Sequence, residues 1–431
     1  MEGVFVKGKE EFVVSVTNKS LSYRLKDEIE TCFVPFEDIL SVKLDEESSF
    51  TVYFAVASKG RKLKKESVTF YGEKAEKFAL ELNSRINNKN RPKKLLVIIN
   101  PNSGQRKAEK IYKNKVKRLF ELSGIEPVVK VTQAPKEAKQ MLQEYDLSTI
   151  DGIVTVGGDG LYCECMTGLV LRVQKDAGVK YNSPEAKVVP ATIPIGIIPA
   201  GSGDYIVQYL HGTRDVTTAA LHIILGKRTN ANVVGVHQDG ELTAYSGLLL
   251  GFGLFGDIMY DCEKFRWMGP TRYNIIPVGT VLRRRAFDLD VEYQLSDTKE
   301  WQKVDDTMYG VDTYVITRTP KDRKMVPKFG DEAINLYMTS KCSFAKHVKQ
   351  LAQVQDHKAE CFDHEFVKER RVDAYKVRLT RASSIISDNG EPGLEEKYYI
   401  NCDGEVITLT HPEFEARFHR NVIQLFGQAE V

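Results

Sequence analysis

The stretch Gly152-Ile-Val-Thr-Val-Gly-Gly-Asp-Gly-Leu-Tyr-Cys-Glu164 decides the expected fold. A β-branched run leads directly into three glycines around Asp159, and a segment suited to a helix follows. The start of a helix offers free N–H groups and a partial positive charge, which suit a phosphate. Glycines let a ligand approach the backbone because no Cβ intervenes. We expect a strand, a phosphate-binding turn and a helix, with Asp159 taking the proton of an attacking hydroxyl; a plain β-turn is the alternative.

The same unit of strand, glycine turn and helix occurs on both sides of this stretch. Leu95–Ile99 runs into Asn100-Pro-Asn-Ser-Gly104, and Ile195–Ile198 runs into Pro199-Ala-Gly-Ser-Gly-Asp204. Continuous apolar runs are typical of strands buried on both faces of a parallel sheet. The repetition predicts an α/β doubly wound domain over residues 90–230, with its ligand beyond the carboxyl ends of the strands.

Two regions with different patterns flank this domain. Residues 1–89 contain short β-rich runs and then one amphipathic helix, in which the apolar residues recur at Ala75, Phe78, Ala79, Leu82 and Ile86. Many strands closed by one helix resemble a pleckstrin-homology domain, a β-barrel with a C-terminal helix. In residues 231–431 strand patterns dominate, which predicts a mostly antiparallel, β-rich second domain whose C-terminal segment returns to the ligand.

Composition excludes several classes of protein. The chain has 431 residues, 42% hydrophobic and 28% charged, with a net charge of +2, which is ordinary for a soluble protein and does not indicate nucleic-acid binding. Its seven scattered cysteines argue for reduced thiols and against a disulfide framework or a zinc site. The most apolar run, Gly247–Gly256, is far shorter than the roughly 20 residues that span a bilayer. We expect a cytoplasmic protein that meets membranes only peripherally.

A basic segment in the N-terminal region is the first candidate for such a contact. Its five cations are Lys59, Arg61, Lys62, Lys64 and Lys65. Each basic residue near an anionic membrane contributes about 1 kcal/mol of attraction. A solvated hairpin tip would show the same composition.

The three glycine turns, together with Asn401-Cys-Asp-Gly-Glu405, make the chain resemble the diacylglycerol and sphingolipid kinase superfamily. The resemblance extends from residue 1 to about residue 427. Within the superfamily, Leu221–Gly226, Gly253–Asp257 and Glu263–Gly269 look most like the corresponding segments of ceramide kinases. The resemblance implies transfer of the γ-phosphate of ATP, with Mg²⁺, to the primary hydroxyl of ceramide.

The resemblance also implies an ATP site, residue by residue. Asp159 would be the general base with Glu164 in support, and Arg266 and Arg272 would contact ATP phosphates. The other implied residues are Asn100, Pro101, Asn102, Thr132, Gly157, Gly158, Gly160, Gly201, Ser202, Gly203, Asp403, Gly404 and Glu405. Taken alone, the arginines are also typical of surface salt bridges, and Glu164 of a first-turn carboxylate favoured by the helix dipole. The Mg²⁺ ligands stay open.

Two residues are implied for the acceptor lipid. Asp257 is a partner for the substrate hydroxyl, and Met259 stands where sphingosine kinases carry an acid that meets an ammonium group. A buried carboxylate facing a neutral amide would be desolvated without a counter-charge. Met259 therefore favours a neutral lipid, ceramide or a relative; diacylglycerol and a sphingoid base are alternatives.

The chain departs from the family pattern at several positions. The first turn has one glycine followed by Gln105-Arg-Lys107, Thr167 and Asn232 replace a usual Asn and a usual acid, and Phe329–Asn335 lacks the second acid of an Asp-Gly-x-x-Asp pattern. These departures bear on the metal more than on the reaction. A catalytically inactive, lipid-binding homologue is a further alternative.

Overall fold

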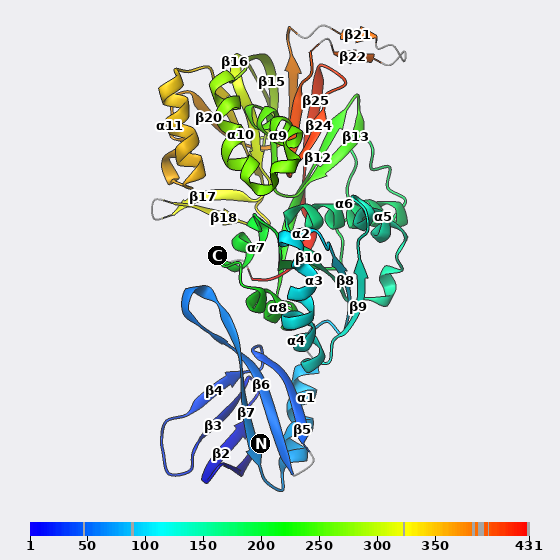
Figure 1. Cartoon of the computed structure of the whole chain (residues 1–431). Helices are drawn as coiled ribbons and strands as arrows, with labels where there is room; N and C mark the ends of the chain where they lie inside the picture. The colour runs from blue at the N-terminus through cyan, green and yellow to red at the C-terminus, as the bar shows by residue number, and fades with distance from the viewer. Residues whose placement is uncertain are drawn as a thin grey trace.

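The computed structural model describes residues 1–431 except 46–47, 88–89, 322–323, 382–383, 387–391, 395 and 429–431. Figure 1 shows an N-terminal sheet at the lower end, parallel strands in the middle and antiparallel strands in the upper part. No helix in the described part of the chain is long and apolar enough to cross a membrane.

The N-terminal sheet is antiparallel, with strand order β4-β3-β2-β1-β7-β6-β5. Its strands are β1 Glu2–Lys7, β2 Glu10–Val16, β3 Ser20–Leu25, β4 Cys32–Pro35, β5 Ile39–Asp45, β6 Ser49–Ala57 and β7 Leu63–Tyr71. Helix α1, Ala75–Asn87, follows and buries the same five apolar residues that its spacing predicts. The rings of Phe5 and Phe78 meet edge to face with centroids 4.8 Å apart, so the helix is fixed on the sheet by aromatic packing.

The hairpin β6–β7, with the short helix η1 Lys59–Arg61 at its tip, reaches up to the central region (Figure 1). The amide of Leu63 donates to Thr218 Oγ1 at 2.9 Å, and Leu40 and Ala55 are buried in the core of the central region. The guanidinium of Arg91 donates to the carbonyls of Phe36, at 2.8 Å, and Ile39. The N-terminal sheet and the central region therefore contact each other directly, and the contact of the basic segment with lipid stays a prediction.

The central region has four parallel strands in the order β9-β8-β10-β11: β8 Lys94–Ile99, β9 Glu126–Val131, β10 Gly152–Gly157 and β11 Ile195–Pro199. Helices α5 Glu137–Glu144, α6 Asp159–Asp176 and α7 Tyr205–His211 pack on one face. The other face is covered by α3 Ala108–Ile111, η2 Tyr112–Val116, α4 Lys117–Leu122 and α8 Val216–Ile224. Helix α2, Ser103–Arg106, and η3, Leu147–Thr149, lie in connections. Asp215 caps α8 by accepting a hydrogen bond from the Thr218 amide.

The upper region is mainly antiparallel. Its strands are β12 Arg228–Gln238, β13 Glu241–Ser246, β14 Leu249–Gly253, β15 Phe287–Leu295, β16 Trp301–Tyr314, β17 Thr317–Lys321, β18 Lys324–Lys328, β19 Ile334–Ser340, β20 Val367–Leu379, β21 Ser384–Ile386, β22 Pro392–Leu394, β23 Tyr399–Cys402, β24 Glu405–Thr408 and β25 Glu413–Phe426. Helix α11, Phe344–Gln355, also belongs to this region, and η5, Ala359–Phe362, follows it.

Strand β25 joins the two halves of the molecule. It pairs antiparallel with β12 and β20 and parallel with β11, where Ile195 is opposite Leu425. The parallel and antiparallel strands therefore belong to one continuous sheet.

Residues 254–283 form a helical segment within the β-rich half, where the sequence indicates mainly strands. Strand β14 ends at Gly253, and α9 Leu254–Lys264, η4 Arg266–Thr271 and α10 Arg272–Arg283 follow. Helix α9 buries two acids, Asp257 and Asp261, together with Leu254, Gly256 and Cys262, and the buried residue of α10 is Thr280. The buried side of this segment is therefore partly polar, unlike the apolar side of an ordinary packed helix.

Candidate active site

The three glycine turns meet at the carboxyl edge of the parallel strands. A Cβ on Gly201 would lie 2.5 Å from Gly158 Cα, and a Cβ on Gly104 would lie 2.2 Å from the carbonyl oxygen of Ala200. These backbones touch, so no larger residue fits at either position. A Cβ on Gly160 would instead meet open space, so the N-terminus of α6 is accessible to a ligand.

Replacing Gly104 by alanine should lower both thermal stability and ATP affinity, because the new methyl group displaces the Ala200 turn. Gly124→Ala is the matched control: both glycines have positive φ (+58° and +71°), but nothing lies within 4 Å of a Cβ at Gly124. Gly124→Ala should lower the free energy of unfolding by the backbone strain alone, about 1–2 kcal/mol. Differential scanning fluorimetry with and without ATP measures both effects, and equal losses in the two variants would contradict the close packing.

The Asp159 carboxylate is fixed by the start of α7. Its Oδ2 accepts from the Tyr205 amide at 3.0 Å and its Oδ1 from the Ile206 amide at 3.1 Å. Burial raises the pKa of this carboxyl, the two amides oppose that rise, and the charge of Asp403 adds to it. A half-buried, oriented carboxylate with a raised pKa suits a general base, because a more basic group accepts a proton more readily.

Asp204 is a neighbouring acid that the sequence does not single out. It is buried, its carboxylate accepts from the Gly201 amide at 3.0 Å, and its φ is +50°. Burial raises its pKa to about 6, and the nearby charge of Asp159 contributes.

The raised pKa of Asp204 predicts a pH-dependent effect of Asp204→Asn. The folded state binds this proton more tightly than the unfolded state, so the wild type should lose stability as pH rises from about 4 to about 6. Asparagine still accepts from the Gly201 amide and tolerates a left-handed backbone. In urea unfolding, the free energy of unfolding of the variant should rise relative to that of the wild type across this window. The relative gain should reach about 1–3 kcal/mol at pH 7. A pH-independent difference would contradict the assignment.

A cleft of about 400 Å³ lies beside the turns. It is lined by Asn100, Asn102, Thr132, Gln133, Ala134, Pro135, Lys136, Leu161, Glu164, Glu263, Arg266, Glu405 and Val406. Burial raises the pKa of Glu164, and the negative charge of Glu405 raises it further, whereas the amides of Lys136 and Ala138 lower it. Arg266 is exposed and paired with Glu263. The cleft thus holds amide and hydroxyl groups, the cations Lys136 and Arg266, and three carboxylates, of which Glu164 and Glu405 repel each other.

Other implied ATP-site residues lie outside the lining of this cleft. Gly157, Gly158, Gly201 and Gly203 form the contacting turns, in which a Cβ on Gly203 would lie 3.2 Å from Asp159 Oδ2; Ser202 is exposed in the same turn, and Pro101 follows Asn100. Arg272 begins α10, stacks over the Tyr273 ring at 4.7 Å and donates to its hydroxyl. The Nε of Arg272 is buried and has no hydrogen-bond partner among the described residues.

Asp403 fixes the loop of residues 246–249 by hydrogen bonds. Its carboxylate accepts from the Ser246 hydroxyl at 2.8 Å and from the amides of Gly247, Leu248 and Leu249 at 2.7–2.9 Å. The Gly404 amide donates to Asn401 Oδ1 at 2.8 Å. These contacts fix the turn that carries Glu405 into the cleft, so Asp403 acts on the cleft through position and charge.

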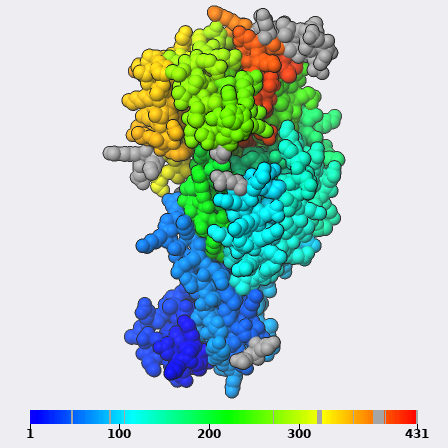
Figure 2. Space-filling view, in the orientation of Figure 1, coloured from blue at the N-terminus to red at the C-terminus, as the bar shows by residue number. Residues whose placement is uncertain are grey.

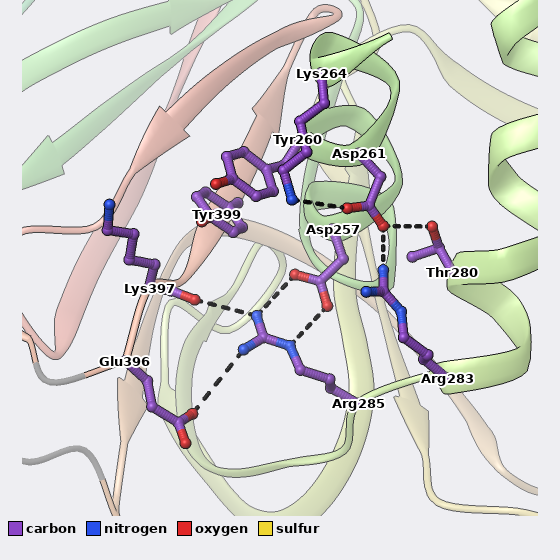
Figure 3. A pocket seen from close by; sticks show the side chains of 10 residues that line it. All are labelled: Asp257, Tyr260, Asp261, Lys264, Thr280, Arg283, Arg285, Glu396, Lys397 and Tyr399. Carbon is purple, nitrogen blue, oxygen red and sulfur yellow. Dashed lines mark hydrogen bonds and ion pairs between the residues drawn. The ribbon is translucent and has the colours of Figure 1, made fainter.

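A second cavity, also about 400 Å³, is lined in part by α9 (Figure 3). Asp257, Tyr260, Asp261 and Lys264 project into it from one face of the helix, since they are spaced three and four residues apart. The other lining residues are Thr280, Arg283, Arg285, Glu396, Lys397 and Tyr399.

Both carboxylates of α9 in this cavity already have cationic partners. Arg285 donates to Asp257 through two bonds of 2.9 and 2.8 Å, and Asp257 is only 8% exposed. Thr280 donates to Asp261 at 2.7 Å, and Arg283 also pairs with Asp261. The sequence pattern contains Arg285 only as part of a basic run, which is typical of a solvated surface, so this partnership was not predicted.

Met259 does not share this cavity. It is two residues from Asp257 and four from Glu263, which places it on the face of α9 that carries Glu263 towards the first cleft. Met259 is not among the residues that line either cavity, so its contact with the lipid stays a prediction. Helix α9 contributes to both cavities, with Glu263 in the first and Asp257 in the second.

Residues 94–236 match the family model of the diacylglycerol kinase catalytic domain. Human ceramide kinase is 30% identical over 483 aligned residues, which cover 93% of this chain and 89% of that protein. The chain belongs to the ceramide kinase family. Membership of the ceramide kinase family makes it a lipid kinase of the diacylglycerol kinase superfamily, as the motifs imply.

Two further similarities are less extensive than the match to the ceramide kinase family. Sphingosine kinase 1 of Arabidopsis thaliana is 35% identical over 201 residues, covering 46% of this chain and 39% of that protein. A diacylglycerol kinase structure from Bacillus anthracis superimposes with a TM-score of 0.51 at 15% identity, covering 79% of this chain and 98% of the other. The latter establishes a shared fold only.

Proposed function

We propose that this lipid kinase transfers the γ-phosphate of ATP to the primary hydroxyl of ceramide, giving ceramide 1-phosphate. The observation that carries the proposal is the pair of cavities to which α9 contributes, the first through Glu263 and the second through Asp257. Six of the residues implied for ATP line the first cleft. The second cavity contains Asp257, whose negative charge is compensated by Arg285.

ATP would occupy the first cleft and the adjoining glycine turns. The chemistry of the groups present fits a nucleoside triphosphate. The open N-terminus of α6 and the adjoining glycine turns can bind phosphate, and Arg266 can form charge-assisted hydrogen bonds to it. Arg272, whose Nε lacks a partner, is a second candidate for a phosphate contact. Asn100, Asn102 and Thr132 would contact the nucleotide from the β8 and β9 ends.

Mg²⁺ fits the same cleft. Glu164 and Glu405 repel each other there, and a cation between them would relieve that repulsion. The described residues contain no cluster of three or more His, Cys, Asp or Glu able to hold a metal. We therefore propose that Glu164 and Glu405 assist in holding a Mg²⁺ ion bound mainly by phosphate oxygens and water, where it neutralises phosphate charge.

Asp159 would take the proton of the ceramide hydroxyl as the oxygen attacks the γ-phosphorus. A new P–O bond forms to ceramide, the bond to the bridging oxygen of ADP breaks, and the proton stays on the Asp159 carboxyl. The amides of Tyr205 and Ile206 hold the carboxylate in place for this transfer. Asp403 positions Glu405 and raises the basicity of Asp159 without touching either reactant.

The pairing of Asp257 supports a neutral acceptor. An ammonium group entering this cavity would have to compete with Arg285 for a carboxylate that is already doubly bonded. The hydroxyl and amide of ceramide need no counter-charge and can hydrogen-bond to the spare lone pairs of Asp257. Diacylglycerol is the second neutral candidate.

We also propose the following organisation: residues 1–89 form a pleckstrin-homology-like domain, residues 90–230 bind ATP and residues 231–431 bind the lipid. The antiparallel sheet closed by α1 supports the first assignment. A cytoplasmic enzyme that associates peripherally with membranes fits a water-insoluble substrate.

The deciding experiment is a transfer assay with purified protein, labelled ATP and three acceptors: ceramide, diacylglycerol and sphingosine. We expect phosphate transfer to ceramide to exceed transfer to the other two. Higher turnover of sphingosine would overturn the acceptor assignment. Lipid binding without any transfer would support the inactive, lipid-binding alternative.

A further inference from the structure

Helix α10 turns an apolar stripe outward. Ile275, Val278 and Leu282 are 53%, 60% and 64% exposed. Their spacing of three and four residues places them on one side of the helix, and the buried Thr280 lies on the other. A helix on the surface of a soluble domain normally shows the reverse pattern, with its polar face outward.

The preceding segment extends this surface. Trp267 in η4 is 82% exposed, and Phe265 and Tyr273 are 38% and 45% exposed. The chain has only two tryptophans, and a tryptophan exposed to this extent marks an interaction site more often than a plain surface. In Figure 2 the yellow-green spheres of this part of the chain project from the face shown.

The charge of the segment selects the class of partner. Residues 264–285 contain six basic residues and no acidic one: Lys264, Arg266, Arg272, Arg283, Arg284 and Arg285. Four of them pair with Asp257, Asp261 and Glu263 of α9, and residues 257–285 still carry a net charge of +3 (six basic and three acidic residues), compared with +2 for the whole chain. Apolar side chains rimmed by Lys and Arg, with an aromatic ring at the boundary, suit the interface of an anionic bilayer.

The position of α10 relates this surface to the acceptor cavity. Thr280 and Arg283, on the inner side of the helix, line the cavity that contains Asp257, and both contact Asp261 of α9 (Figure 3). One helix therefore borders the cavity with its inner side and presents the apolar stripe with its outer side. A bilayer against the stripe would lie one helix diameter from the cavity.

We propose that η4 and α10 dock on an anionic lipid bilayer through Trp267, Ile275, Val278 and Leu282, so that a lipid enters the Asp257 cavity directly from the membrane. The link to lipid entry rests on the proposed function, whereas the docking itself does not. This surface lies away from the N-terminal region, which is at the opposite end of the molecule in Figure 1.

The test uses the full chain and vesicles of phosphatidylcholine with or without phosphatidylserine. The variant Ile275→Gln/Val278→Gln/Leu282→Gln keeps helix propensity and charge but removes the apolar stripe. Sedimentation should show it binding phosphatidylserine vesicles on the order of 100-fold more weakly than wild type, from the lost burial of three side chains. The matched control is Ile29→Gln/Phe33→Gln in the N-terminal region, where the two residues are 97% and 67% exposed.

Two single-tryptophan variants identify the residue that meets the bilayer. Trp301→Phe leaves Trp267 as the only tryptophan, and Trp267→Phe leaves Trp301. Emission of the first should shift to the blue when phosphatidylserine vesicles are added, and emission of the second should not. Wild-type vesicle binding by the triple variant, or unchanged Trp267 emission on bound protein, would overturn the proposal. Loss of binding in the Ile29/Phe33 control alone would assign docking to the N-terminal region instead.

Activity separates docking from catalysis. On a short-chain ceramide dispersed in detergent, the triple variant should phosphorylate as fast as wild type, whereas on long-chain ceramide in vesicles its apparent KM should rise. If the wild type phosphorylated neither the short-chain nor the long-chain ceramide, the proposed function would be refuted. The vesicle-binding result would still test the docking surface, because it does not depend on activity. An unchanged vesicle KM alongside normal detergent activity would refute the docking role.

Discussion

Asp159→Asn should lower kcat for ceramide phosphorylation by about 10²–10⁴-fold while ATP still binds. Asparagine retains one acceptor oxygen for the α7 amides but cannot take the proton of the acceptor hydroxyl. The variant should therefore fold, because its side-chain oxygen still accepts from one of the two amides, Tyr205 or Ile206, and only the other hydrogen bond is lost. Kinetics at saturating ATP, with the dissociation constant of ATP measured by calorimetry, separate catalysis from binding.

Asp215→Asn is the matched control for Asp159. Asp215 is also an aspartate whose carboxylate caps a helix, through the Thr218 amide at 2.8 Å, and it supports the neighbouring helix α8. Its replacement should cost at most about 1 kcal/mol of stability and leave kcat near the wild-type value. A similar loss of kcat in both variants would mean that Asp159 acts only as a helix cap. Near-wild-type turnover by Asp159→Asn would refute its role as base.

Arg285→Met should change the choice of acceptor lipid. It leaves Asp257, 8% exposed, as a buried carboxylate without its doubly bonded partner. An unpaired buried charge is unfavourable, and the ammonium of sphingosine can restore the lost interaction whereas ceramide cannot. The ratio of kcat/KM for sphingosine to that for ceramide should rise about 10–100-fold, as expected for one charge-assisted hydrogen bond. Competition between the two lipids in mixed micelles measures this ratio directly.

The double variant Asp257→Asn/Arg285→Met provides the control, because it removes both charges. Its ratio should return towards the wild-type value, and its melting temperature should recover part of what Arg285→Met loses. Arg283→Met is a second comparison, since Arg283 lines the same cavity but pairs with Asp261. If Arg283→Met shifted the acceptor ratio as strongly as Arg285→Met, the general loss of positive charge would explain the effect, and the specific pairing with Asp257 would not.

The turns of the candidate site were predictable because local chemistry determines them. An apolar run followed by Gly-Gly-Asp-Gly has few alternatives to a strand that ends in an open turn, and the same reasoning applies at Asn100 and Gly201. Helix α1 was equally visible, since its five apolar residues pack on one sheet and nothing interrupts their period.

The rest depends on contacts between distant segments, which no local pattern encodes. The nucleotide contact implied for Asp403 stays a prediction, whereas no local pattern indicates that its carboxylate accepts from amides more than 150 positions earlier. Arg285 looked like a solvated cation because its partner, Asp257, lies on another element. Helices α9 and α10 were missed because one buries acids and the other exposes apolar residues. Both exceptions lie next to the acceptor cavity, where binding a ligand competes with the ordinary pattern of burial.

Strand β25 has a consequence for how the protein is made. It lies between β11 and β20 in the middle of the sheet, although the ribosome makes it after every other strand described. Until synthesis has passed Phe426, β11 lacks its parallel partner, and β12 and β20 expose unpaired edges. The nascent chain therefore carries aggregation-prone edges until β25 has been made, and the sheet of the lipid kinase closes only then. A premature stop that removes β25 would yield a chain that depends on chaperones and has no kinase activity.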